Sequence, residues 1–207
     1  MENKRICYIV GAGECAGLDF TVSAGDFVIA ADGGLRYLEA AGIKANLLLG
    51  DFDSLGYQPE GTVLTYPKEK DETDSFLALR YAVANGYRCV RVYGAMGGRL
   101  DHTLANVQML TWAARRGLDV RLCDGSVELC AVCDGEMAFS AERKGQISIF
   151  SMDERAEGVD IFGLKYCIND DELTNEFPLG VSNAFVGTAS TVRVRKGTLL
   201  ILTDSNA

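Results

Sequence analysis

The sequence predicts an α/β domain built on a parallel sheet, followed by a smaller all-β domain. Up to about residue 125, short β-branched runs alternate with segments of helical period, and after Asp124 that period disappears. Strand–helix alternation builds a parallel sheet covered by helices, whereas many short strands separated by turns build a sandwich or barrel. We therefore expect one domain over residues 1–125 and a second over residues 126–207.

The expected strands of the first domain are short and apolar. They are Arg5–Val10, Phe27–Ala31, Leu47–Gly50, Thr62–Tyr66, Cys89–Tyr93 and Asp119–Cys123. The expected helices are Leu35–Ala41, Asp74–Asn85 and His102–Arg116. Helical period places Phe76, Leu79 and Val83 on one face of the second helix, and Leu104 on the apolar face of the third.

The second domain offers short runs with turn residues between them. The clearest expected strands are Ile147–Ser151, Val159–Phe162, Thr191–Arg195 and Leu199–Thr203. Cys130 and Cys133 have the spacing of a zinc ligand pair, but no second pair lies nearby in the sequence. We interpret them as strand residues in an all-β sandwich or barrel.

Composition narrows the class of protein. Of 207 residues, 48% are hydrophobic and 24% are charged, so the chain buries a core. The formal net charge of −9 repels nucleic acid and anionic membranes, so neither is an expected partner, and a nucleotide site would need local cations or a metal. No run approaches a membrane span. The seven cysteines are odd in number and mostly lie in apolar runs, which favours reduced thiols and a cytoplasmic location.

Acidic residues gather where strands of the first domain end. They are Asp32, Asp51, Asp53, Asp71, Asp74 and Asp101. A parallel sheet brings such positions to one edge. Asp51 and Asp53 would share a face of extended chain, roughly 6 to 7 Å apart, and Mg²⁺ would relieve their repulsion. The alternative is that these residues only make turns and cap helices, as Asp74 would at the start of its helix.

Two glycine-rich segments fall on the same edge. Gly11-Ala-Gly13 does not match the dinucleotide fingerprint, so it provides either close backbone approach to a nucleotide or an ordinary strand-to-helix turn. The segment Gly94–Arg99 combines exposed amides, a guanidinium and a helix start, which together favour an anion. Lys68 and Lys70 add cations, and His102, the only histidine, follows the arginine loop. We expect His102 to contact phosphate.

The ordered set of motifs resembles the thiamine pyrophosphokinase family. The motifs are Asp32-Gly-Gly, Gly50-Asp-Phe-Asp-Ser54, Lys70-Asp-Glu-Thr-Asp74, Gly97-Gly-Arg-Leu-Asp-His102 and Gly180-Val-Ser-Asn183. The resemblance implies a Rossmann-like nucleotide domain followed by a β-sandwich, and a homodimer with thiamine held near the dimer interface. It also implies transfer of a diphosphoryl group from ATP to the thiamine hydroxyl, with Mg²⁺ as cofactor, to give thiamine diphosphate and AMP.

The resemblance assigns roles in the first domain residue by residue. The implied magnesium ligands are Asp51, Asp53 and Asp74. The implied nucleotide-binding residues are Asp32, Gly33, Arg99, Asp101 and His102. The implied catalytic residues are Asp71, Asp74 and Lys70. Among these, Asp71 is our choice for the acceptor of the hydroxyl proton, and Lys70 would hold phosphate.

In the second domain the implied thiamine-binding residues are Ser182, Asn183 and Phe185. The sequence departs from the family pattern here, because Ala184 stands where a glutamate is usual and the only tryptophan is Trp112. Some members carry a stacking tryptophan near the C-terminus. Phe185 or Phe177 would stack on the cationic thiazolium instead.

Two alternatives remain open from the sequence. One keeps the chemistry but changes the acceptor to another hydroxymethyl heterocycle, such as a pterin. The other is a non-catalytic regulator that binds a nucleotide or thiamine on the same scaffold. In such a regulator the motif carboxylates would typically be eroded, and in this sequence they are intact.

Overall fold

The computed structural model describes residues 5–50, 61–65 and 71–205. The chain forms two compact units. The first comprises Met1–Met109 and Leu118–Gly125, and the second comprises Leu110–Gly117 and Ser126–Ala207. Among the described residues, no helix is both long enough and apolar enough to span a membrane.

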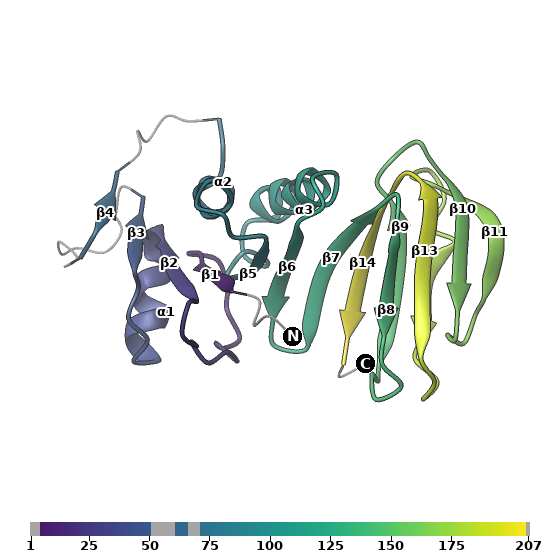
Figure 1. Ribbon diagram of the computed structural model, residues 1–207, viewed down its shortest axis with the longest axis horizontal. Coiled ribbons are helices and arrows are strands. Elements are labelled where there is room, and N and C mark those ends of the chain that lie inside the picture. Colours follow the sequence, from purple (N-terminus) through teal and green to yellow (C-terminus); the bar gives the residue numbers. More distant parts are fainter. Residues whose placement is uncertain (1–4, 51–60, 66–70, 206–207) are drawn as a thin grey trace. The chain divides into compact units, whose positions relative to one another are not determined.

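The first unit is built on parallel strands. They are β1 (Ile6–Val10), β2 (Phe27–Ala31), β3 (Leu47–Leu49), β4 (Val63–Leu64), β5 (Cys89–Tyr93) and β6 (Asp119–Asp124). Their order is β6-β5-β1-β2-β3-β4, and each neighbouring pair is parallel (Figure 1). Strands β2, β3 and β4 therefore follow one another on one side of β1, and β5 and β6 lie on its other side. Open parallel sheets bind ligands where the order reverses in this way, at the carboxyl ends of the strands.

Helices cover both faces of these strands. They are the short 3₁₀ helix η1 (Asp32–Gly34), α1 (Leu35–Ala40), α2 (Asp74–Ala84) and α3 (Leu100–Ala114). Leu35 and Leu38 of α1 pack in one apolar cluster with alternate residues of the strands, such as Tyr8 and Val10. Because successive strand residues face opposite sides, α2 is left to pack on the other face, as Figure 1 shows.

The expected helices are confirmed to within two residues, but their buried faces were predicted only in part: Leu79 is buried as expected, whereas Phe76 and Leu104 are not. In α2 the buried face centres on Ala78, Leu79 and Ala82, while Phe76 is only partly buried. The alanines turn toward the sheet because small side chains allow close approach of the helix. Leu104 of α3 is 58% exposed. Both helices are apolar on more than one side, so the period alone does not identify the face in contact.

The second unit is all-β after Ser126, as expected. Its strands are β7 (Val127–Cys133), β8 (Glu136–Phe139), β9 (Gln146–Ser151), β10 (Arg155–Phe162), β11 (Ile168–Thr174), β12 (Gly180–Ala184), β13 (Ser190–Lys196) and β14 (Thr198–Asp204). Within this unit they form two antiparallel sets, β12-β9-β14-β7 and β11-β10-β13-β8. Buried residues from both sets form one core cluster, as in a sandwich.

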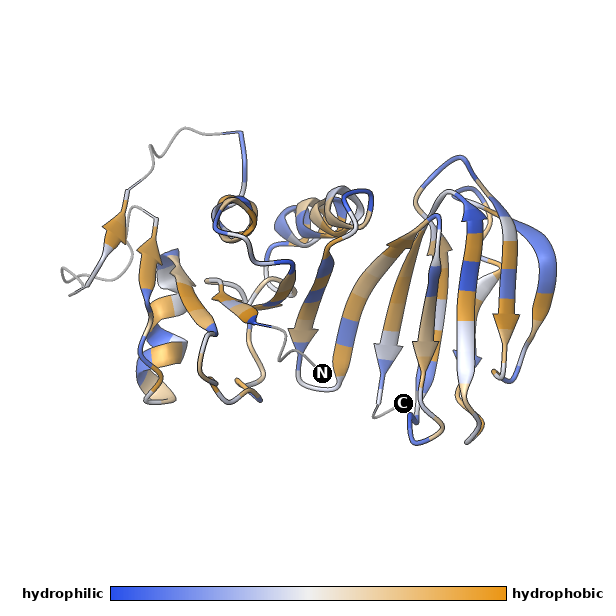
Figure 2. Cartoon of the chain, in the orientation of Figure 1, coloured by the Kyte–Doolittle hydropathy of each residue, from blue (hydrophilic) through white to orange (hydrophobic). Residues whose placement is uncertain are grey.

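Alternation of side chains along these strands explains the core. Val192 and Val194 of β13 are buried while Arg193 and Arg195 between and after them are exposed, and Figure 2 shows the matching bands of hydropathy. Cys130 of β7 is 2% exposed and belongs to the same cluster. The interpretation of Cys130 as a strand-packing residue is therefore confirmed.

A partly buried ion pair at β5 and β6 contributes to the stability of the first unit. Burial by itself raises the pKa of Asp119, but hydrogen bonds and charge from Arg91, with help from Arg121, lower that pKa to about 2. The Arg91 Nη2 to Asp119 Oδ2 distance is 3.0 Å. Because the folded pKa lies below the unfolded one, the stabilisation is complete above about pH 4 and is lost as the pH falls toward 2.

We expect Asp119→Asn to lower the free energy of unfolding at pH 7 by about 1 kcal/mol, since one third of the carboxylate side chain is exposed and screened. Urea unfolding at pH 7, 4 and 2.5 measures this. The difference between wild type and variant should shrink as the pH falls. A difference that stays constant down to pH 2.5 would show that the charge of Asp119 is not the cause.

Candidate active site

A cavity of about 410 Å³ lies at the carboxyl ends of β1, β2 and β5. Its lining comes from residues 11–14 after β1, 31–32 after β2, 73–75 at the start of α2, 94–95 and 97–99 after β5, and positions 102 and 106 of α3. These segments are far apart in the sequence and meet where the strand order reverses. The cavity is therefore at the place where a sheet of this topology binds a ligand.

Part of the cavity wall is formed where the backbone after β1 is in direct contact with the backbone after β5. The Gly11 amide donates to the Tyr93 carbonyl at 2.8 Å, and the Gly13 amide donates to the Gly94 carbonyl at 2.9 Å. Gly94 has φ of +59°, and a Cβ there would lie 2.4 Å from the Gly11 oxygen. No helix occurs between β1 and β2, so the strand-to-helix interpretation of Gly11-Ala-Gly13 is wrong. The glycines are required by close backbone approach.

The loop after β5 brings a cation to the cavity. Gly97 and Gly98 adopt φ of +76° and +62°, a conformation that favours glycine, and they lead into Arg99 before α3. The Arg99 guanidinium lies 2.6 Å from Asp101, and that hydrogen bond and charge raise the pKa of Arg99 and lower the pKa of Asp101. Arg99 and His102 line the cavity, whereas Asp101 is not part of its lining and pairs with Arg99 at the surface.

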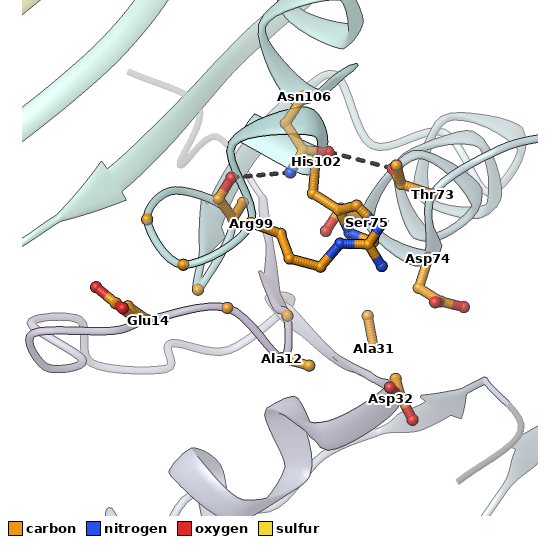
Figure 3. Close-up of a pocket in the computed structure, with 16 residues that line it drawn as sticks. Ala12, Glu14, Ala31, Asp32, Thr73, Asp74, Ser75, Arg99, His102 and Asn106 are labelled. Carbon is orange, nitrogen blue, oxygen red and sulfur yellow. Dashed lines mark hydrogen bonds between the residues drawn. The ribbon is translucent and has the colours of Figure 1, made fainter. Parts of the chain in front are cut away.

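Two acidic residues lie around the same cavity. Asp32 is the first residue of η1, with φ of +49°, and Asp74 is the first residue of α2; Figure 3 shows both beside the cavity with Arg99. The N-cap of α2 is Thr73, whose Oγ1 accepts from the Phe76 amide at 3.2 Å. The alternative interpretation of Asp74 as the cap is therefore wrong, and Asp74 lines the cavity.

Several predicted residues are elsewhere or are not described. Gly33 follows Asp32 in η1 and is not part of the lining, and Asp71 is exposed and also outside it. Asp51, Asp53 and Lys70 lie outside the described residues. Their assigned roles stay predictions.

A divalent cation can be judged against the donor groups that the structure describes. Within residues 5–50, 61–65 and 71–205, no three carboxylate, imidazole or thiol groups come together as a metal-binding set. Asp32 and Asp74 nevertheless both line one cavity. Mg²⁺ commonly takes one or two carboxylates and completes its coordination with water and phosphate oxygens. The chemistry of this donor pair fits magnesium.

Four polar lining residues were assigned no role from the sequence: Glu14, Thr73, Ser75 and Asn106. Thr73 could have been found, because threonine just before an apolar helical segment is a cap signal. Asn106 could also have been found, because it is an amide within the apolar stretch that forms α3. In the structure it is only 3% exposed. Glu14 and Ser75 have no comparable signal.

The predicted thiamine residues lie in the second unit. Asn183 is buried and lines a cavity of about 350 Å³ with Tyr166, Leu179 and Val181 among others. Its Oδ1 accepts from the Tyr166 and Ala184 amides at 2.9 Å, and its Nδ2 donates to the Tyr166 carbonyl at 2.7 Å. Asn183 therefore shapes its cavity by holding the chain at Tyr166.

The other two predicted thiamine residues differ in setting. Ser182 is exposed with φ of +60°, and its amide donates to the Ser148 hydroxyl at 3.2 Å. Phe185 packs against the core, with its ring centroid 5.4 Å from that of Phe139. Phe177, the alternative stacking residue, is 65% exposed. Of the two phenylalanines, Phe177 is the more exposed.

Comparison with known proteins identifies relatives of the whole chain. Residues 20–122 match the family model described as thiamin pyrophosphokinase, catalytic domain, and residues 138–199 match the one described as thiamin pyrophosphokinase, vitamin B1 binding domain. The thiamine pyrophosphokinase of Bacillus subtilis (strain 168) is 30% identical over 186 residues, covering 86% of this chain and 87% of that protein.

Solved structures agree with the sequence matches. A crystal structure of thiamine pyrophosphokinase from Bacillus subtilis superposes with a TM-score of 0.88 at 28% identity, covering 99% of this chain and 100% of the other. The enzyme from Geobacillus thermodenitrificans gives a TM-score of 0.85 at 28% identity, with 97% of each chain covered. The chain therefore belongs to the thiamine pyrophosphokinase family and is an enzyme of that type.

Proposed function

We propose that this enzyme moves the diphosphoryl group of ATP to the hydroxyl of thiamine, and that its first unit is a Rossmann-like nucleotide domain. The observation that carries the proposal is the cavity at the strand reversal, where glycine backbone, Arg99 and two aspartates meet. An enzyme with a net charge of −9 needs such a local cation to hold a triphosphate. Membership of the thiamine pyrophosphokinase family indicates that the acceptor is thiamine.

The phosphates of ATP are proposed to lie against the Gly97–Gly98 backbone. Arg99, held by Asp101, donates to phosphate oxygens as charge builds in the transition state, and His102 adds a further contact. The wall made by Gly11 and Gly94 lets the nucleotide approach main chain closely. These residues position the phosphates and neutralise their charge, which is most of what diphosphoryl transfer requires of a protein.

Magnesium is proposed to be held by Asp74 together with Asp51 and Asp53, with Asp32 close by. When bound, the ion supplies positive charge that neutralises phosphate oxygens. The thiamine hydroxyl oxygen attacks the β-phosphorus and forms a new P–O bond, while the bond to the α-phosphate oxygen breaks and AMP leaves. Asp71 is proposed to accept the hydroxyl proton, and Lys70 to hold phosphate.

Thiamine is proposed to bind through the second unit, where Ser182 and Asn183 fall in the segment matched by the vitamin B1 binding model. Phe185, or the more exposed Phe177, would stack on the thiazolium. We also propose a homodimer in the cytoplasm. Exposed apolar residues such as Tyr166 and Leu179 favour the dimer, and seven cysteines that are not joined in disulfides favour a reducing compartment.

The proposal is tested by supplying thiamine, ATP and Mg²⁺ to the purified enzyme and quantifying thiamine diphosphate and AMP by chromatography. Equal amounts of both products are expected. If AMP forms only with a hydroxymethyl pterin, the acceptor is the pterin and not thiamine. Tight ATP binding without AMP release for any acceptor would favour the non-catalytic regulator.

A further inference from the structure

Asn106 joins two walls of the cavity. It is 3% exposed, in the middle of α3. Its Nδ2 donates to the Ala95 carbonyl at 2.8 Å, and its Oδ1 accepts from the Thr73 hydroxyl at 3.2 Å. Figure 3 shows both hydrogen bonds at the edge of the cavity.

The two partners of this amide belong to segments that are distant in sequence. Thr73 is the N-cap of α2, and its Oγ1 also accepts from the Phe76 amide. It directly precedes Asp74. Ala95 is 7% exposed and belongs to the loop that leads from β5 to Arg99. One side chain therefore connects the start of the helix that carries Asp74 to the loop that carries Arg99.

Burying an amide costs free energy, because its polar atoms lose their hydrogen bonds to water and need partners within the protein. A leucine at position 106 would pack in the apolar stretch of α3 without that cost. The amide instead provides a donor and an acceptor in fixed directions, and each is used by a different segment. Its geometry suits a spacer between two backbone elements.

We propose that Asn106 is a positioning residue that sets the distance between the start of α2 and the loop after β5. The inference rests on the proposed function. Asp74 and Arg99 act on one polyphosphate from two different segments that line the same cavity, so their separation determines whether both contact it in the transition state. Small displacements of positioning groups can lower rates about 10²-fold.

The expected result is a loss in kcat in variants that remain folded at the assay temperature. Asn106→Leu removes both hydrogen bonds and should lower kcat about 10- to 100-fold, with KM for thiamine changed far less. Thr73→Val removes the hydroxyl that Asn106 contacts and should also lower kcat, whereas Thr73→Ser keeps the hydroxyl and should restore it. Asn85→Ala is the matched control, because Asn85 donates to the Tyr81 carbonyl at 2.8 Å outside the cavity.

Steady-state kinetics are measured well below each variant's Tm, beside the wild type. If Thr73 and Asn106 act as one unit, the double variant Thr73→Val/Asn106→Leu should lose no more activity than the worse single variant. Wild-type kcat in folded Asn106→Leu would overturn the inference. Should Asn106→Leu not fold, equal kcat for Thr73→Val and Thr73→Ser would overturn it instead. A wild type that makes no thiamine diphosphate would refute the proposed function, a separate outcome.

Discussion

Replacing Asp74 by asparagine should lower the rate of thiamine diphosphate formation about 10²-fold or more, with little change in stability. Asn keeps the size of the side chain but removes the charge that we assign to magnesium and phosphate neutralisation. Asp74 occupies the first turn of α2, so the lost charge at the helix start should cost only about 0.3 to 1 kcal/mol of stability. Product formation at a series of Mg²⁺ concentrations measures the effect, and the variant should need more Mg²⁺.

Asp171→Asn is a suitable control for this substitution, because Asp171 is an exposed carboxylate on β11 in the second unit. It should match the wild type in rate and in Mg²⁺ requirement. The same loss is expected for Asp53→Ala. A wild-type Mg²⁺ response in Asp74→Asn would remove Asp74 from the metal site and leave the assignment to the two earlier aspartates.

Replacing Gly94 by alanine should destabilise the enzyme by about 3 kcal/mol or more, because a left-handed backbone conformation and a steric clash act together. The φ of Gly94 is +59°, and the new Cβ would lie 2.4 Å from the Gly11 carbonyl oxygen. That oxygen is part of the main chain and cannot rotate away. Chemical unfolding of the soluble variant measures the loss; accumulation only as insoluble protein would agree with it.

Gly42→Ala separates the two causes. Gly42 has φ of +66°, close to that of Gly94, but a Cβ added at this position would have no other atom within 4 Å. Only the backbone cost remains there, and we expect about 1 kcal/mol. Equal losses at the two positions would mean that the contact between Gly11 and Gly94 contributes nothing.

The parts of the fold that depend on local sequence were predictable. Strand–helix alternation predicted the elements of the first unit, because β-branched runs and helical period are local properties. The gathering of Asp32, Asp74 and Arg99 on one edge followed from topology, since parallel strands end on the same side. The buried faces of the helices followed only in part: Leu79 is buried as predicted, but the positions of Phe76 and Leu104 depend on which side of each helix meets the sheet, and the sequence does not show that.

The supporting residues of the site were the least predictable. Asn106 acquires its role only because Thr73 and Ala95, distant in sequence, are brought beside it. Its place in the apolar stretch of α3 marks Asn106 as unusual in the sequence, but it does not indicate which segments its amide contacts. Asn183 shows the same limit in the second unit, since its hydrogen bonds to Tyr166 depend on where β12 passes the preceding loop.

The wall formed by Gly11, Gly13 and Gly94 has a bearing on how this enzyme could be re-engineered. Because that surface consists of backbone amides and carbonyls, a substitution cannot change its hydrogen-bonding groups. Any side chain added at these glycines would instead disturb the close contact between the two backbone segments. Side-chain changes intended to alter the choice of phosphate donor are therefore better made at neighbouring positions such as Ala12 and Glu14, which line the same cavity. A mutant library seeking a new phosphate donor should randomise those two sites and leave the glycines untouched.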